Sequence, residues 1–222
     1  MGSYLNPGSG RFRGSLRSRI YVDKTGLIAK LNDWLFTEQK YVCVSRPRRF
    51  GKSMAADMLA AYYDSGENTT ELFAGLAVSQ SATYREHLNQ YDVIKINMQE
   101  FLSATRGVEE MLSMLQRRLL AELKRKYPQY IEEEQLVFAM QDVYAQTRQP
   151  FVILIDEWDC LFREYKNDTQ AQKEYLDFLR AWLKDKDYVA LAYMTGILPI
   201  KKYGSHSALN MFTEYSMVDP GE

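Results

Sequence analysis

The stretch SRPRRFGKS at residues 45–53 follows the apolar run Tyr41–Val44 and leads into a segment rich in alanine and methionine. Gly-Lys-Ser between an expected strand and an expected helix is typical of the end of a phosphate-binding loop, where backbone N–H groups and the start of the helix face an anion. Such a loop opens with glycine five positions before Gly51, where this chain has Arg46. The loop can still close if Arg46 keeps a negative φ. A basic surface turn is the alternative interpretation.

Strands and helices are predicted to alternate on both sides of this loop. The predicted strands cover residues 41–45, 91–98, 151–155, 188–195 and 212–218, and the predicted helices cover 24–36, 51–63, 108–127, 132–146 and 170–185. This alternation is typical of an α/β fold with a mostly parallel sheet, here of about five strands, and helices on both faces. Residues 1–40 are expected to form a lead-in, irregular over 1–20, and a helix that packs on the core of residues 41–222.

Composition limits the classes of function. The 222 residues suit one domain, and 46% apolar with 26% charged residues is ordinary for a globular protein. A formal net charge of −1 gives no whole-chain attraction to nucleic acid or to anionic membrane. No apolar run has the length and position of a membrane span or a signal peptide. Cys43 and Cys160 are expected to be small buried apolar residues. We therefore expect a cytoplasmic protein that does not engage a membrane.

Two further strand ends carry residues suited to nucleotide hydrolysis. The sequence FVILIDEWD places Asp156 and Glu157 directly after a continuous apolar strand. Asp156 would belong to the Mg²⁺ shell, and Glu157 would orient and deprotonate the attacking water. Thr195 ends the next strand and could position water beside the terminal phosphate. The alternatives are a surface turn for the two carboxylates and an ordinary strand residue for Thr195.

Because parallel strands bring their carboxyl ends to one edge of a sheet, these strand ends are expected to meet. Their agreement predicts a P-loop NTPase domain, a three-layer sandwich. Lys52 would reach the β- and γ-phosphates, and Ser53 would join Asp156 on Mg²⁺. The predicted nucleotide-binding residues are Arg46, Pro47, Arg48, Arg49, Phe50, Gly51, Lys52, Ser53 and Met54. For Arg48 and Arg49, contact with phosphate, contact with a partner and a solvated loop all stay open.

Four stretches resemble the bacterial AAA-ATPase-like family. They are IYVDKTGLI (20–28), VSRPRRFGKS (44–53), IDEWDCLFREY (155–165) and LAYMTGILPIKKYGSHSALNMF (191–212). Members of that family commonly have Arg-Pro-Arg-Arg-Phe at the start of this loop. The resemblance therefore accounts for arginine, rather than glycine, at position 46. It implies ATP as the nucleotide and the same roles for Lys52, Ser53, Asp156 and Glu157.

The resemblance also implies a longer architecture. Members typically carry a P-loop ATPase domain followed by a region similar to PD-(D/E)XK nucleases, and the second region is expected to be missing here. Tyr21, Asp23, Lys24 and Thr25 match an N-terminal signature that either lines the base or sugar of the nucleotide or packs against the sheet edge.

Two functions therefore stay open at this stage. The first is Mg²⁺-dependent ATP hydrolysis. The second is a nucleotide-gated regulatory module with negligible turnover, which acts with a nuclease-like partner domain. A protein partner, a homo-oligomer and a nucleic acid reached through the nuclease-like region also stay open. Lys201 and Lys202 either approach the site or lie in a solvated loop, and neither His87 nor His206 receives a role.

Overall fold

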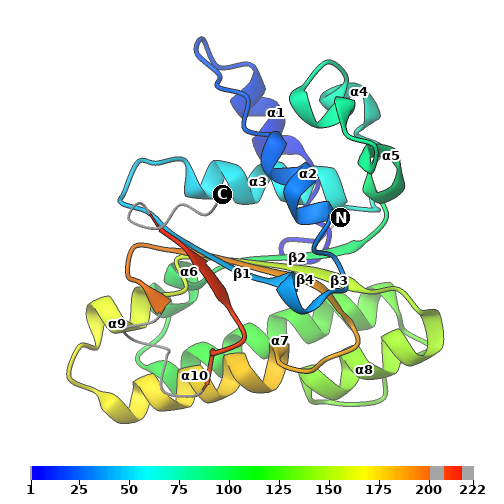
Figure 1. The fold of residues 1–222 in the computed structure, drawn as a ribbon. Helices are drawn as coiled ribbons and strands as arrows, with labels where there is room; N and C mark the ends of the chain where they lie inside the picture. The colour runs from blue at the N-terminus through cyan, green and yellow to red at the C-terminus, as the bar shows by residue number, and fades with distance from the viewer. Residues whose placement is uncertain (1, 201–207, 217–222) are drawn as a thin grey trace.

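The computed structural model describes residues 2–200 and 208–216, and in these residues a parallel sheet forms the centre of the molecule (Figure 1). The strands are β1 (Tyr41–Ser45), β2 (Asp92–Asn97), β3 (Phe151–Asp156), β4 (Val189–Gly196) and β5 (Thr213–Tyr215). They lie in the order β2-β3-β4-β1-β5, and every pair is parallel. The predicted α/β class and parallel sheet are therefore confirmed.

Helices cover both faces of the sheet (Figure 1). One face carries α1 (Gly10–Leu16), α2 (Gly26–Asn32), α3 (Lys52–Tyr63), α4 (Thr70–Phe73) and α5 (Tyr84–His87). The other carries α6 (Met98–Ser103), α7 (Val108–Lys126), α8 (Leu136–Thr147), α9 (Cys160–Glu164) and α10 (Thr169–Leu183). Short 3₁₀ turns cover Glu38–Lys40 (η1) and Ala77–Gln80 (η2). In the described part of the chain, no helix has both the length and the apolar character of a membrane span.

The two faces follow from the alternation of side chains along each strand. Val152 and Leu154 of β3 join the core that includes α3, whereas Ile153 and Ile155 join the core formed with α7 to α10. The whole of β3 is buried, so the continuous apolar run marks a strand covered on both sides.

Strand register determines which side chains meet at the carboxyl edge of the sheet. Ser45 of β1 pairs with Gly196 of β4, and Asn97 of β2 pairs with Asp156 of β3. Because β4 lies between β1 and β3, the end of β4 separates the start of the phosphate loop from Asp156. The three strand ends singled out in the sequence therefore lie on neighbouring strands.

The N-terminal region differs from the prediction in two ways. Residues 10–16 form α1, although the first 20 residues are expected to be irregular. This helix contains two glycines and few apolar residues, but Phe12 is buried and stacks on Phe73 with ring centroids 5.2 Å apart. The next helix, α2, begins at Gly26 rather than Lys24, because the side chain of Asp23 bonds within the preceding turn. In α1, tertiary contacts therefore override local propensity.

The N-terminal segment also lies along the edge strand β2. Leu5 forms an antiparallel bridge with Ile94, and the Asn6 N–H donates to the Val93 carbonyl oxygen at 2.7 Å. An uncovered edge strand exposes unpaired backbone groups, so this segment protects β2 from pairing with another chain.

Candidate functional site

The phosphate-loop residues connect β1 to α3, and two of them have left-handed backbone angles. Arg49 has a φ of 69° and Gly51 a φ of 76°. Arg46 lies outside that region, and its N–H donates to the Gly196 carbonyl oxygen at 3.1 Å. The loop therefore closes with arginine at its first position, because the unusual backbone angles occur later in the loop.

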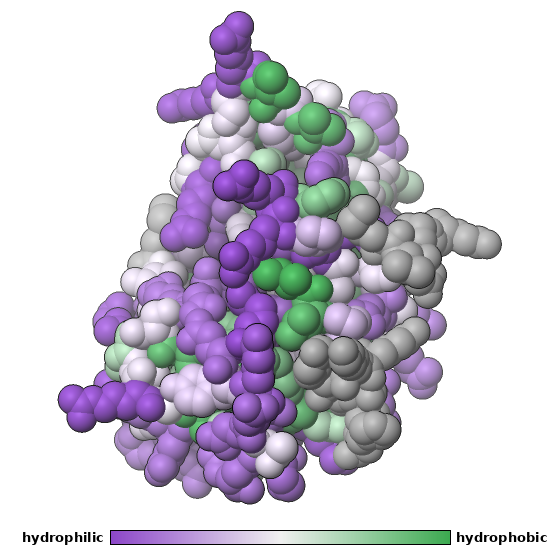
Figure 2. All heavy atoms as spheres, turned by 90° about the vertical axis from the view of Figure 1, so that its left-hand side faces the viewer, coloured by the Kyte–Doolittle hydropathy of each residue, from purple (hydrophilic) through white to green (hydrophobic). Residues whose placement is uncertain are grey.

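Most side chains of this loop face solvent. Pro47, Arg48, Arg49, Phe50, Ser53 and Met54 are exposed, whereas Arg46 and Gly51 are half-buried. Figure 2 views the molecule from the side on which the loop lies, and hydrophilic side chains cover much of this face. Within the described residues, the side chains of Arg48 and Arg49 have no ion pair or hydrogen bond, so both are available to a ligand.

Lys52, the first residue of α3, is folded back into the loop. Its side chain is buried at the loop, and its Nζ donates to the carbonyl oxygens of Arg46 and Pro47, each at 2.9 Å. These carbonyl oxygens stabilise the ammonium group without neutralising its charge. An anion in the loop could therefore replace them as the partner of Lys52.

Three of the predicted residues, Ser53, Glu157 and Thr195, donate hydrogen bonds to Asp156. Its side chain is buried, and Ser53 Oγ donates to its Oδ2 at 2.5 Å. Thr195 Oγ1 and the Glu157 N–H both donate to Oδ1, the latter at 3.0 Å. The carboxylate thus joins the start of α3 to the ends of β3 and β4.

The oxygen atoms of Ser53 and Asp156 are suited to a magnesium ion. Mg²⁺ is usually bound through one or two carboxylates, with waters and substrate phosphates completing its shell. Over residues 2–200 and 208–216, no group of three or more His, Cys, Asp or Glu side chains could hold a metal ion. These two residues fit an ion that a nucleotide would bring with it, and they do not form a complete protein cage.

Glu157 follows Asp156 in the sequence, but its side chain contacts different residues. Its φ is 55°, a left-handed angle that is uncommon for a residue other than glycine. Its carboxylate forms an ion pair with Arg163 Nη2 of α9, and Arg163 Nε lies 3.4 Å from Asp159 Oδ2. The predicted base therefore has a cationic partner that sequence reasoning did not identify.

Asp159 fixes the loop that follows β4. Its side chain is buried and accepts hydrogen bonds from the N–H groups of Ile197 and Leu198 at 3.0 and 2.8 Å. The backbone N–H of Trp158 donates to the Thr195 carbonyl oxygen at 3.1 Å. Sequence reasoning missed Trp158 and Asp159, although both lie in the DEWD stretch. Lys201 and Lys202 lie outside the described residues.

A cleft of about 360 Å³ lies beside the metal-type residues. Ser53 and Asp156 form part of its wall, together with Asp57, Lys95 and Asn97. Lys95 forms an ion pair with Asp57, so the charges in this cleft are partly balanced.

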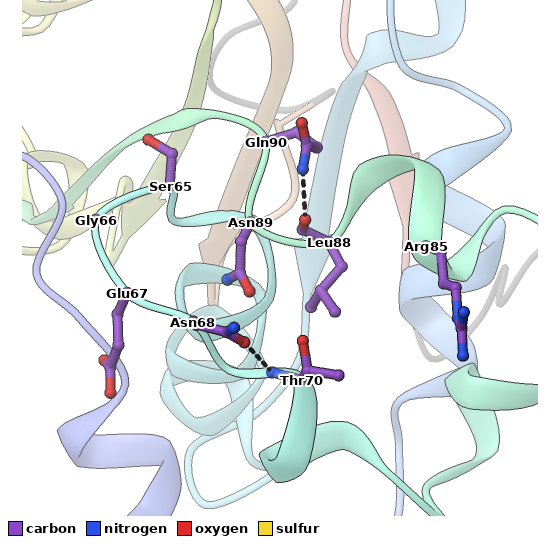
Figure 3. A pocket seen from close by; sticks show the side chains of 9 residues that line it. All are labelled: Ser65, Gly66, Glu67, Asn68, Thr70, Arg85, Leu88, Asn89 and Gln90. Atoms are coloured by element: carbon purple, nitrogen blue, oxygen red, sulfur yellow. Dashed lines mark hydrogen bonds between the residues drawn. The ribbon is translucent and has the colours of Figure 1, made fainter.

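A second hollow of about 580 Å³ is shown in Figure 3. It is lined by residues that follow α3 or precede β2, such as Gly66, Asn68 and Gln90. Its two drawn hydrogen bonds are local: Thr70 N–H donates to Asn68 Oδ1, and Gln90 Nε2 donates to the Leu88 carbonyl oxygen. None of the predicted site residues lines this hollow, so we place the candidate site at the phosphate loop.

Comparison with known proteins relates the sequence of this chain to a family. The family model described as Predicted AAA-ATPase matches residues 15–205, which is most of the chain. A protein of Azotobacter chroococcum mcd 1, described as an uncharacterized protein in the vnfD 5' region, is 26% identical over 207 residues. The aligned part covers 89% of this chain and 37% of that relative, so the chain spans little more than a third of the relative's length.

Proposed function

This chain belongs to the predicted AAA-ATPase family, and on that premise we propose that it binds ATP with Mg²⁺ and hydrolyses it. The observation that carries the proposal is the 2.5 Å contact between Ser53 Oγ and Asp156 Oδ2. A hydroxyl and a carboxylate this close can ligate one ion, and they lie where the phosphate loop meets α3. Geometry and family membership therefore support the same site.

The phosphates would lie in the loop between β1 and α3. Backbone N–H groups at the start of α3 bind their oxygens, and the dipole of a 12-residue helix favours the negative charge. Lys52 exchanges the carbonyl oxygens of Arg46 and Pro47 for oxygens of the β- and γ-phosphates. The exposed guanidinium groups of Arg48 and Arg49 add positive charge at the mouth of the loop.

Ser53 and Asp156 would hold the magnesium ion. When bound, Mg²⁺ neutralises charge on the β- and γ-phosphates and so favours the breaking of the bond between them. Asp156 Oδ2, which accepts the hydrogen bond from Ser53, is the carboxylate oxygen that would face the ion. Thr195 keeps its own bond to the other carboxylate oxygen and thereby holds Asp156 in orientation.

Glu157 would activate the attacking water. It accepts a proton from that water, the water oxygen bonds to the γ-phosphorus, and the bond from the γ-phosphorus to the bridging oxygen breaks. The products are ADP and inorganic phosphate. To act in this way, the Glu157 carboxylate must leave Arg163, its partner in the structure.

That ion pair also favours the second candidate function, a nucleotide-gated module with negligible turnover. While Arg163 holds Glu157, ATP can bind without being hydrolysed, and occupancy is signalled to a partner domain. A nuclease-like region of a longer protein, as implied by the resemblance, is the partner that we propose for this module.

The two functions are separated by measuring ATP binding by calorimetry and phosphate release by a coupled assay. For the enzyme, Lys52→Ala weakens binding, whereas Glu157→Gln retains binding and lowers turnover about a hundredfold or more. Lys166→Ala, at an exposed lysine outside the site, should match the wild type. ATP binding without phosphate release supports the module. Failure of the wild-type protein to bind ATP contradicts both functions.

A further inference from the structure

A lysine from outside the phosphate loop reaches the loop. Gly51 lies at the left-handed turn before α3, and a Cβ atom built on it would be 3.5 Å from Lys24 Nζ. Lys24 precedes α2 and is far from Gly51 in sequence. The fold therefore brings a separate ammonium group to the point at which the helix begins.

The residues on either side of Lys24 are firmly held. The Asp23 carboxylate accepts hydrogen bonds from the Thr25 N–H and hydroxyl at 2.8 and 2.7 Å, and from the Ala77 N–H at 2.7 Å. Thr25 is fully buried, and its Oγ1 accepts a bond from the Val78 N–H at 3.0 Å. Asp23 and Thr25 thus attach this segment to the 3₁₀ turn η2, and not to the edge of the sheet.

The charge state of Asp23 is consistent with its role in attaching this segment to η2. Partial burial, the largest single effect on Asp23, raises its pKa, but the hydrogen bonds from Thr25 and Ala77 together outweigh burial and lower the pKa below its ordinary value. The carboxylate is therefore ionised at neutral pH, and its bonds to backbone N–H groups are charge-assisted.

Lys24 itself has a different character from its neighbours. Its side chain is exposed, and within the described residues it has no hydrogen bond or ion pair. The start of α3 carries partial positive charge, and Arg48, Arg49 and Lys52 add three cations to the same loop. The Lys24 ammonium group would be a fourth cation at the phosphate loop, and the other three repel it unless an anion lies between them.

We propose that Lys24 is a nucleotide contact whose ammonium group binds an oxygen of a non-transferred phosphate, the α- or β-phosphate, of the bound nucleotide. This inference rests on the proposed function. Lys24 Nζ lies near Gly51, two residues before Ser53, and Lys24 does not line the cleft that contains Ser53 and Asp156. Asp23 and Thr25 are positioning residues that hold the Lys24 backbone.

The test is titration of ADP and of ATP, each with Mg²⁺, into the wild-type protein and into Lys24→Met, Lys24→Arg and Lys166→Met. We expect Lys24→Met to weaken binding of both nucleotides about tenfold, as for the loss of one charge-assisted contact. Lys24→Arg should retain most of the affinity. Lys166→Met, which removes an exposed lysine elsewhere, should bind like the wild type.

Three outcomes would overturn the inference. Equal affinities for wild type and Lys24→Met would show that Lys24 makes no contact, while the proposed function would stand. A loss for ATP alone would move Lys24 to the terminal phosphate. If the wild-type protein binds neither nucleotide, the proposed function fails, and this inference fails with it.

The positioning role of Asp23 is tested with Asp23→Asn and the double variant Asp23→Asn/Lys24→Met. If Asp23 acts through Lys24, the double variant binds nucleotide no more weakly than Lys24→Met alone. Additive losses would mean that Asp23 affects the site independently, and would contradict the assignment. A thermal unfolding curve for each variant confirms that the compared proteins are folded.

Discussion

Ser53 Oγ lies 2.5 Å from Asp156 Oδ2, although the two residues are 103 positions apart and belong to different elements. Ser53 is the second residue of α3, directly after the phosphate loop, and Asp156 ends the buried strand β3. Parallel strands and one connecting loop are enough to produce this contact, because all strands end at the same edge of the sheet. Thr195, from β4, which lies between β1 and β3, bonds to the other oxygen of the same carboxylate.

We predict that the ion pair between Glu157 and Arg163 lowers the rate of ATP hydrolysis. Arg163→Gln removes the cation, so we expect phosphate release to rise about fivefold, corresponding to a contact of roughly 1 kcal/mol, with unchanged affinity for ATP. Arg163→Lys retains a cation and serves as the control. Slower release by a folded Arg163→Gln protein would instead mean that Arg163 positions Glu157 for reaction.

A side chain at position 196, at the end of β4, is expected to clash with its neighbours. A Cβ atom at this position would lie 2.6 Å from Trp158 Nε1 and 3.0 Å from Asp159 Oδ1. Trp158 and Asp159 are buried and have little room to move. We therefore expect Gly196→Ala to lower the free energy of unfolding by about 1–3 kcal/mol, measured by urea denaturation.

Gly14→Ala is a matched control for that variant. Gly14 lies within α1, and a Cβ atom there meets no atom within 4 Å. Alanine should stabilise this helix position by about 0.5–1 kcal/mol. Equal effects of the two substitutions would contradict the steric account of Gly196.

His87 predicts a pH dependence of stability. Burial lowers its pKa below the ordinary value of 6.5, although Glu86 and Asp33 act in the opposite direction, and its Nδ1 lies 2.7 Å from the Tyr91 hydroxyl. The unfolded chain therefore binds a proton at a higher pH than the folded chain does. The stabilisation from neutral His87 is complete above pH 6.5 and declines as the pH falls toward the lowered pKa.

The measurement for His87 is the free energy of unfolding at pH 7.5, 6.5 and 5.5 for the wild type and for His87→Asn. We expect the wild type to lose more stability than the variant between pH 6.5 and 5.5. The difference between the two proteins removes the contribution of carboxylates, which titrate in both. Identical pH slopes would show that His87 is not the group responsible.

The sheet could be predicted because its strands carry local signals. Both β3 and β4 are buried along their whole length, and β1 agrees with the prediction from residue 41 to 45. The helix α1 could not be predicted, because it is stabilised by the burial of Phe12 against Phe73 and not by its own propensity. The short helices α4, α5, α6 and α9 have too few residues for a periodic pattern.

The candidate site, too, could be predicted only in part from the sequence. Asp156 and Thr195 could be placed at one edge because they lie at strand ends, and Lys52 and Ser53 because they follow the loop that leaves β1. The contact of Glu157 with Arg163 could not be predicted, because it depends on the left-handed backbone of Glu157 and on the short helix α9. The approach of Lys24 to Gly51 could not be predicted either, because the segment that carries Lys24 is held by long-range hydrogen bonds to η2. Strand ends could therefore be predicted from this sequence, whereas these two side-chain contacts could not.

The most direct test is a crystal structure of the protein with a non-hydrolysable ATP analogue and Mn²⁺ in place of Mg²⁺, with the metal located by anomalous scattering. The proposal predicts one strong anomalous peak about 2.0–2.3 Å from Ser53 Oγ, in contact with the β- and γ-phosphates and in the coordination shell of Asp156. A nucleotide bound elsewhere, or a metal peak away from both Ser53 and Asp156, would contradict it.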